Sequence, residues 1–319
     1  MGWLIPLFIL LILAALVMTV ALVCFFIIFY SPRRKPVGQD EYPVPPGDIY
    51  EPFHSQFIAW TKGMRTMEHR DVSILSHDGL VLRGKYFEYK KGAPMEILFH
   101  GYRGTSERDL GGGVYRCFAL GRNALIVDHR GSGTSDGHVI TFGIKESLDC
   151  LRWVDFAIKE IDPEAKIILT GISMGASTVM TASGIPLPKN VVGILADCGF
   201  TSAKAIIQKV MKDMGIPGKI LYPFVRLGAR IFGGFDPDAD SAIAAMERCH
   251  LPILFFHGDA DAYVPAYMSE ENLAACVSAK KRLVKIKGAG HGLCFPCDQA
   301  TYLQELGDFF APELAEKEI

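Results

Sequence analysis

The chain has 319 residues, with 33 Lys and Arg against 35 Asp and Glu, a formal net charge of -2 and 50% hydrophobic residues. This balance excludes a basic nucleic-acid-binding protein and an acidic disordered tail protein, and eight dispersed cysteines exclude a small disulfide scaffold. The mean hydropathy of +0.22 is high for a soluble chain. The excess lies at the N-terminus, and the rest of the chain has the composition of an ordinary globular domain.

Residues 3–30 form an apolar run without Asp, Glu, Lys, Arg or His, interrupted only by Pro6 and Thr19. A helix of this length is about 42 Å long and can cross a hydrocarbon core of about 30 Å with tilt. A cleaved signal peptide fits less well, because the run lacks a charged n-region, is about twice the usual length and has no A-x-A pattern before Ser31. We therefore expect an uncleaved, single-pass membrane anchor over residues 3–30.

Three basic residues, Arg33, Arg34 and Lys35, follow the apolar run directly. By the positive-inside rule they place the C-terminal domain in the cytoplasm. The cysteines form no dense framework, which fits a reducing compartment. Residues 31–52 contain six prolines and predict an extended tether between the anchor and a domain over residues 53–319.

Beyond the tether, the hydrophobic spacing predicts a helix over residues 53–67, packed on the domain, and then an antiparallel hairpin across Asp78-Gly79. Strands and helices alternate from there, as is typical of an α/β protein with a parallel sheet covered on both faces. The predicted strands are residues 72–75, 80–87, 95–99, 124–127, 166–170, 191–196, 253–256 and 283–286, and the later helices are residues 144–160, from 174, 267–277 and 298–310.

The interval between the sixth and seventh predicted strands is too long for one crossover, and two helical stripes of apolar residues lie within it. We interpret residues 201–248 as an inserted helical cap whose Met211, Met214 and Phe224 line a substrate pocket. Residues 201–235 carry six basic side chains and one acidic one. Solvated lysines explain such a count; the alternative is a cap that favours anionic or acyl-chain substrates or rests on an anionic membrane surface.

Two stretches match the pattern G-x-S-x-G, and their contexts differ. Ser135 follows a Gly-rich loop and leads into His138-Val-Ile-Thr, so it is interpreted as a loop residue. Ser173 directly follows a buried strand and precedes a segment that can begin a helix at once, which is the context of a nucleophile elbow. The helix behind Ser173 also points backbone N–H groups toward developing negative charge.

A serine hydroxyl needs a base, and His291 lies in a flexible Gly-rich loop just past the last predicted strand. His129 and His138 are weaker candidates, and His54, His69, His77 and His250 lie outside this arrangement. The acid that orients the base is expected after the preceding strand, where we choose Asp261 over Asp259, with Asp197 as a third candidate. The resulting chain order Ser, Asp, His is the one that this architecture predicts.

With these motifs the sequence from about Glu68 to Phe310 resembles the α/β-hydrolase superfamily, most of all its monoacylglycerol-lipase-like and serine-aminopeptidase-like group. The matching motifs are His100-Gly-Tyr-Arg-Gly104, Asp128-His-Arg-Gly-Ser-Gly-Thr-Ser135, Gly171-Ile-Ser-Met-Gly175, His257-Gly-x-x-Asp261 and Gly290-His-Gly292. The resemblance implies a mostly parallel eight-stranded sheet and a triad of Ser173, Asp261 and His291. It also implies an oxyanion hole from the backbone N–H groups of Tyr102 and Met174, and neither a metal nor an organic cofactor. His100 is expected to brace the oxyanion loop, and Asp128 and Arg130 to order their own.

The sequence therefore predicts a membrane-anchored serine hydrolase that cleaves carboxylic esters of small or lipid-like molecules through an acyl-enzyme. Peptide or amide cleavage, thioester cleavage and acyl transfer on the same triad remain open, as does a non-catalytic scaffold. The pair Cys294 and Cys297 is expected to be structural and unpaired, with redox control of the histidine loop as the alternative. The sequence leaves the oligomeric state undetermined.

Overall fold

The computed structural model describes residues 3–32 and 37–315 of the chain. Arg33, Arg34 and Lys35, on which the predicted orientation in a membrane depends, lie outside the described residues. The described part contains one sheet with the strand order β1-β2-β4-β3-β5-β6-β7-β8, in which β1 and β2 run antiparallel to their neighbours and the remaining pairs are parallel. The predicted mostly parallel eight-stranded sheet is therefore confirmed. The strands are β1 (Arg70–Leu75), β2 (Val81–Phe87), β3 (Met95–Phe99), β4 (Asn123–Val127), β5 (Ile167–Ile172), β6 (Val191–Asp197), β7 (Ile253–Gly258) and β8 (Lys281–Ile286).

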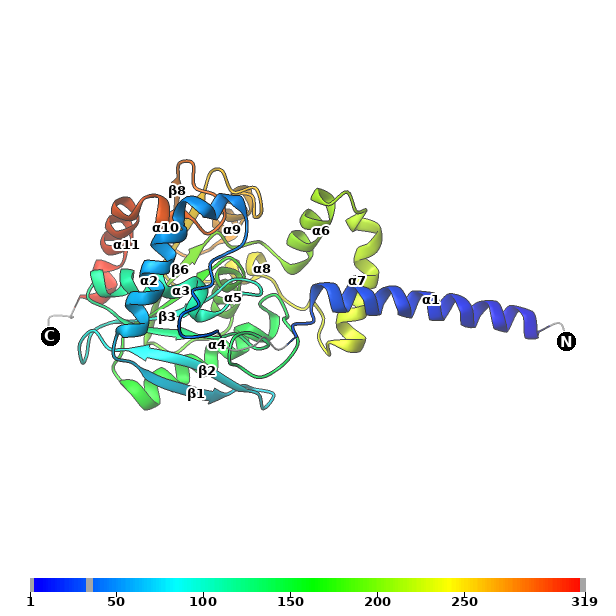
Figure 1. Cartoon of the computed structure of the whole chain (residues 1–319), viewed down its shortest axis with the longest axis horizontal. Coiled ribbons are helices and arrows are strands. Elements are labelled where there is room, and N and C mark those ends of the chain that lie inside the picture. The colour runs from blue at the N-terminus through cyan, green and yellow to red at the C-terminus, as the bar shows by residue number, and fades with distance from the viewer. Residues whose placement is uncertain (1–2, 33–36, 316–319) are drawn as a thin grey trace.

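Helices cover both faces of the sheet, with α2, α3, α10 and α11 on one face and α4, α5, α8 and α9 on the other (Figure 1). A 3₁₀ turn over Asp48–Phe53 precedes α2, and a π-helical turn over Ala157–Ile161 extends α4. The helices are α1 (Leu4–Ile28), α2 (His54–Thr66), α3 (Ser106–Ala119), α4 (Ile144–Phe156), α5 (Met174–Ser183), α6 (Ala203–Asp213), α7 (Gly218–Phe232), α8 (Ala242–Met246), α9 (Tyr267–Ala275), α10 (Cys294–Cys297) and α11 (Gln299–Leu314).

The two-faced core follows from the alternation of side chains along each strand. In β3, Ile97 packs in the cluster that contains Trp153 of α4, whereas its neighbour Leu98 packs with Val114 of α3. All five residues of β3 and of β4 are buried. Central strands covered on both faces favour apolar residues, which is why these segments are mostly apolar. The exception within β3 is Glu96, whose buried carboxylate pairs with Arg116 and Arg122.

Helix α3 is the longest element that the sequence patterns do not predict. Its run Gly111-Gly112-Gly113 lowers helix propensity and hides the helical period. The structure gives the glycines a packing role: a Cβ on Gly112 would lie 2.7 Å from the Trp60 ring, and one on Gly113 would lie 2.6 Å from the Leu98 side chain. The glycines thus let α3 lie close to both α2 and the sheet.

The apolar run at the N-terminus forms α1, a 25-residue helix whose length and composition allow it to cross a membrane, although a signal sequence meets the same test. Residues 3–17 are exposed and project away from the sheet domain (Figure 1). The last part of α1 is different, because Ala21 and Phe25 are buried against the cap. A Cβ on Gly228 of α7 would lie 2.3 Å from the Ala21 carbonyl oxygen, so the two helix backbones touch where they cross.

The inserted segment after β6 is helical, with α6, α7 and α8. Its charge is less positive than the sequence window suggests, because that window ends one residue before Asp236. In the structure Asp236 accepts two hydrogen bonds from Arg226 and pairs with Arg230, and Asp213 pairs with Lys209. Three of the six basic side chains are thus paired with local acids.

Candidate active site

Ser173 lies in the tight turn between β5 and α5, with φ 56° and ψ −117°. A non-glycine residue with this backbone is strained and persists only where its surroundings hold it. The turn is possible because both flanking glycines lack a side chain. A Cβ on Gly171 would lie 2.1 Å from the Gly175 backbone, and one on Gly175 would lie 2.1 Å from the Phe99 carbonyl oxygen. The predicted elbow context of Ser173 is thus what the structure contains.

Three side chains from separate loops at the carboxyl edge of the sheet form one hydrogen-bonded chain. His291 Nε2 lies 2.9 Å from Ser173 Oγ, and His291 Nδ1 lies 2.7 Å from Asp261 Oδ2. The other carboxylate oxygen, Oδ1, accepts hydrogen bonds of 2.9 Å from the backbone N–H groups of Tyr263 and Val264. In this arrangement Nδ1–H of His291 donates to Asp261, which leaves Nε2 free to accept the proton of the Ser173 hydroxyl.

The charge on Asp261 is maintained by its neighbours. Burial favours the neutral acid, but hydrogen bonds from His257 and His291 outweigh burial and lower the pKa of the Asp261 carboxyl to about 2. His257 is fully buried beneath the carboxylate, with Nε2 2.8 Å from the Val264 carbonyl oxygen and 3.4 Å from Asp261 Oδ2. Its Nδ1 lies 2.6 Å from Ser269 Oγ. Asp261 is therefore ionised throughout the neutral range.

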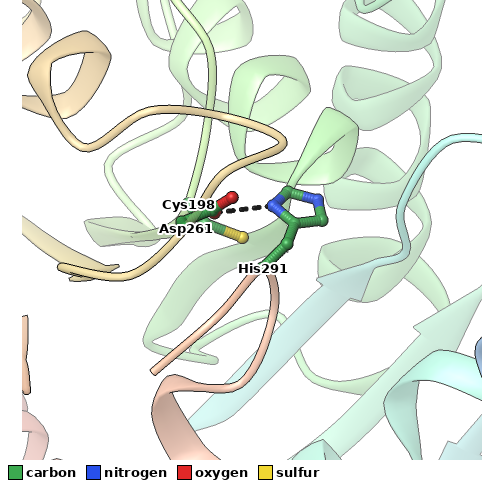
Figure 2. A group of neighbouring side chains, drawn as sticks. All are labelled: Cys198, Asp261 and His291. Atoms are coloured by element: carbon green, nitrogen blue, oxygen red, sulfur yellow. Dashed lines mark hydrogen bonds and ion pairs between the residues drawn. The ribbon is translucent and has the colours of Figure 1, made fainter. Parts of the chain in front are cut away.

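The thiol of Cys198 lies beside the same pair, as Figure 2 shows with the Asp261 carboxylate directed at the imidazole of His291. Ligand atoms of these three residues lie within 4.8 Å of one another. They fit a metal poorly, because burial raises the pKa of the Cys198 thiol well above its usual value and the other two groups are bonded to each other. The arrangement fits proton transfer better than metal binding.

A second cluster of His77, Asp78 and Asp149 also has the spacing of metal ligands. Here the guanidinium of Arg130 donates to both carboxylates, with distances of 2.7 to 3.0 Å. Arg130 thus occupies the position that a cation would take and orders its own loop, as expected. Asp128 likewise accepts hydrogen bonds from the backbone N–H groups of Ser106 and Thr134.

The alternative acids and the second serine have other partners. Asp259 accepts a hydrogen bond of 2.6 Å from the Gly288 N–H. Asp197 accepts one of 3.0 Å from the Tyr302 hydroxyl, and it borders a small cavity that Ser173 does not line. Ser135 Oγ donates to the Asp128 carbonyl oxygen and accepts from Arg83 N–H. These contacts keep Asp259, Asp197 and Ser135 out of the chain of bonds around His291.

The remaining candidate histidines have structural contacts. His100 Nε2 accepts a hydrogen bond from the backbone N–H of His129, and its Nδ1 lies 2.7 Å from the Gly101 carbonyl oxygen. His100 thus joins the oxyanion loop, defined here as His100–Gly104, to the loop that follows β4. His138 stacks on Tyr30 of the N-terminal segment. Within the described residues, no hydrogen bond or ion pair joins His54, His69, His77 or His250 to Ser173, Asp261 or His291.

The oxyanion loop lies next to the serine. A Cβ on Gly101 would be 3.6 Å from Ser173 Cβ and 3.9 Å from its Oγ. Tyr102 follows Gly101 in this loop, and Met174 is the first residue of α5, where the backbone N–H has no acceptor within its own helix. The two residues named for the oxyanion hole therefore lie on the two segments that flank Ser173.

An apolar cluster adjoins the serine and includes Met174, Phe142 and Phe200 together with inner residues of the cap. Met211 and Phe224 pack against this cluster, and their place in a substrate pocket stays a prediction. Met214 does not: it is 69% exposed at the C-terminal end of α6. The helical period extends through Met214, but the helix ends there and its side chain turns outward, so Met214 is removed from the predicted pocket.

Sequence reasoning missed His257, Cys198 and the N-terminal residues Phe25 and Phe29 of the apolar cluster. The signal for His257 is its place as the last side chain of β7 before Gly258, directly under the Asp261 loop.

Cys294 and Cys297 are free thiols, the first buried and the second exposed. They begin and end the short helix α10.

The strand order, the elbow after β5 and the acid and histidine loops after β7 and β8 define the α/β-hydrolase fold. The solved structure of the Pyrococcus furiosus esterase Pf2001 has a TM-score of 0.66 at 22% identity, over 89% of this chain and 100% of that chain. Alpha/beta hydrolase domain-containing protein 10 from mouse has a TM-score of 0.56 at 20% identity, over 76% and 99%. Likeness at these identities establishes the fold.

Sequence relatives with curated names are similar to this chain over only part of its length. The chain is 26% identical over 191 residues to the uncharacterized protein YqkD of Bacillus subtilis. The aligned region covers 60% of this chain and 62% of that protein. It is 24% identical over 252 residues to protein bem46 of Schizosaccharomyces pombe, 77% of each chain. No family model matches the chain. The narrower likeness to monoacylglycerol-lipase-like hydrolases stays a prediction.

Proposed function

We propose that this protein is a membrane-anchored serine hydrolase that cleaves carboxylic esters. The observation that carries the proposal is the hydrogen-bonded chain from Ser173 Oγ through His291 to Asp261, assembled on an elbow beside the oxyanion loop. The esterase fold shared with Pf2001 supports the same reaction class. The fold alone does not define an activity, so the proposal depends on the site.

In the proposed reaction, Ser173 Oγ attacks the acyl carbon of the ester while its proton passes to Nε2 of His291. Asp261 stabilises the imidazolium through Nδ1, and the N–H groups of Tyr102 and Met174 hold the oxyanion. His291 then protonates the leaving alcohol, and the acyl group stays on Ser173. Water, deprotonated by His291, attacks the acyl-enzyme, and the imidazolium returns the proton to Ser173 Oγ as the acid is released.

The apolar cluster beside Ser173 favours an acyl chain as the part of the substrate that the enzyme binds. Hydrolysis of p-nitrophenyl esters of increasing chain length, compared with an aminoacyl amide and a thioester, tests this preference. We expect the ester rate to rise with chain length and to exceed the amide rate. A preference for the amide would reassign the enzyme to the peptidases, and transfer of the acyl group to an added alcohol would reassign it to the acyltransferases.

The decisive test of the site is labelling by a fluorophosphonate probe, which reacts only with an activated serine. We expect labelling of the wild type and none of Ser173→Ala. Ser135→Ala is the matched control, because Ser135 has the same G-x-S-x-G pattern but its hydroxyl bonds to the backbone of Asp128 and Arg83. Labelling that persists in Ser173→Ala and disappears in Ser135→Ala would place the nucleophile elsewhere.

We also propose that α1 anchors the enzyme as a single span, with the catalytic domain on the cytoplasmic side. The exposed apolar surface of residues 3–17 and the basic residues that follow α1 in the sequence support this. The full chain is expected to stay in the membrane after alkaline carbonate extraction. Protease added to intact cells should leave the domain uncut, and cleavage by external protease would reverse the orientation.

A further inference from the structure

The C-terminal end of α1 contacts the oxyanion loop through two side chains. The Arg103 guanidinium donates hydrogen bonds of 2.8 Å to the Ile27 carbonyl oxygen and of 3.0 Å to the Tyr30 carbonyl oxygen. The Tyr102 hydroxyl donates one of 2.6 Å to the Ile28 carbonyl oxygen. We propose that the end of α1 is a structural part of the active site and that Arg103 is the positioning residue that couples it to the oxyanion hole.

These contacts stabilise both the end of α1 and the oxyanion loop. The last carbonyl groups of a helix accept no hydrogen bond from the helix itself and carry partial negative charge. A guanidinium group can donate hydrogen bonds to them and neutralise this charge. The loop in turn needs support, because Arg103 has φ 51°, a left-handed backbone that a side chain other than glycine rarely adopts. Arg103 therefore caps α1 and, through the same bonds, holds the strained turn that follows Tyr102.

A second set of contacts joins the same two regions. Beyond α1, Ser31 N–H donates to the His138 carbonyl oxygen at 2.8 Å, and Ile140 N–H donates to the Phe29 carbonyl oxygen at 2.9 Å. Phe142, two residues on, packs its ring 4.9 Å from the Tyr102 ring and 5.8 Å from the Phe29 ring. The N-terminal segment thus supports the residue that carries a proposed oxyanion donor from two directions.

This geometry has a catalytic consequence that rests on the proposed function. An oxyanion donor acts only when it is held at hydrogen-bond distance from the developing charge, and losing one costs about 100- to 1000-fold in rate. When the donor is present but loosely held, the loss of rate should be smaller. Release of α1 from the loop is therefore expected to lower kcat while leaving substrate binding largely intact.

The test uses the full chain in detergent or nanodiscs and compares Arg103→Gln, Arg103→Lys and Tyr102→Phe with the wild type. Arg65→Gln is the matched control, since Arg65 also donates to backbone carbonyl groups of the N-terminal segment, at Gln39 and Glu41, but contacts α3 rather than the oxyanion loop. Intact mass first establishes that residues 1–31 are retained. Hydrogen exchange of the peptide over residues 100–105 and the separate values of kcat and KM are then measured.

For Arg103→Gln we expect exchange of the loop to rise at least about fivefold, kcat to fall about 10- to 100-fold and KM to change less than about threefold. Arg103→Lys should recover part of kcat, and Tyr102→Phe should lose less than Arg103→Gln because both Arg103 bonds to the end of α1 remain. Arg65→Gln should match the wild type in loop exchange and kcat.

Three results would overturn the inference: loop exchange in Arg103→Gln equal to that of Arg65→Gln, a fall in kcat that only follows the loss of folded enzyme in a thermal melt, or an active mature enzyme that lacks residues 1–31. Failure of the proposed function is a separate result. If Ser173→Ala is labelled as strongly as the wild type, Ser173 is not the nucleophile, while the exchange data still decide whether α1 holds the loop.

Discussion

Replacing Asp261 with Asn should disable the base through its tautomer rather than through a change in shape. The Oδ1 atom accepts from two backbone N–H groups, those of Tyr263 and Val264, so the oxygen of an Asn side chain must stay at that position. Its NH₂ group then faces His291 Nδ1, 2.7 Å from the present oxygen, and Nδ1 must become the acceptor. The proton moves to Nε2, which can no longer accept the proton of Ser173. A triad acid replaced in this way lowers kcat about 10⁴-fold, or about 5 kcal/mol of barrier.

The measurement is kcat for a p-nitrophenyl ester at pH 7 to 8 with the amount of folded enzyme normalised by a thermal melt. Asp259→Asn is the control, because Asp259 lies two residues away and its carboxylate accepts from Gly288 N–H on the exposed side of the loop. It should keep activity within about threefold. Should Asp261→Asn retain more than about a tenth of the wild-type kcat, or Asp259→Asn lose as much as Asp261→Asn, the assignment of the acid would be refuted.

Three further predictions concern stability. Gly175→Ala should destabilise the fold by at least about 3 kcal/mol or prevent soluble expression, because its Cβ would meet the Phe99 carbonyl oxygen, whereas Gly63→Ala in α2 meets nothing within 4 Å and should raise the melting temperature slightly. Glu96→Gln should lower the melting temperature by about 10 °C, since it leaves buried Arg116 and Arg122 partly uncompensated. Burial opposes the charge of Glu96, but the two guanidinium groups lower the Glu96 pKa to about 2. The stability that the carboxylate contributes is therefore complete above about pH 4.5 and is lost as the pH falls toward 2. The melting temperature should differ less between pH 7 and pH 3 for Glu96→Gln than for the wild type.

The sheet could be predicted because its central strands are short, apolar and bounded by turn residues. The sequence predicts a strand over residues 166–170 that ends just before an elbow, and β5 extends over Ile167–Ile172. The same order of strands places Ser173, Asp261 and His291 at one edge, because parallel strands bring their carboxyl ends together. Such inferences need only local patterns and the general rule for connecting them.

Helix α3 and the cap charge show where local patterns fail. Three consecutive glycines weaken a helix signal, and only the Trp60 ring and Leu98 explain why the chain has no side chain there. The count of basic residues in the cap depends on where the window ends, and Asp236 lies just beyond it. In both cases the residues that explain the pattern, Trp60 and Leu98 for α3 and Asp236 for the cap, lie outside the segment and are identified only in the folded structure.

The contact of α1 with the oxyanion loop is the extreme case, since Ile27 and Arg103 are 76 residues apart. An apolar run is sufficiently explained by a membrane, and nothing in its composition indicates that its last turn packs on a soluble domain. The structure divides the helix into two parts: residues 3–17 are exposed, while Ala21 and Phe25 are buried against the cap. A helix that serves only as an anchor has no need for a tightly packed crossing such as that of Ala21 with Gly228. That crossing and the Arg103 bonds hold the domain in one orientation relative to α1, so in the proposed membrane-anchored enzyme Ser173 is expected to keep a fixed position relative to the membrane normal.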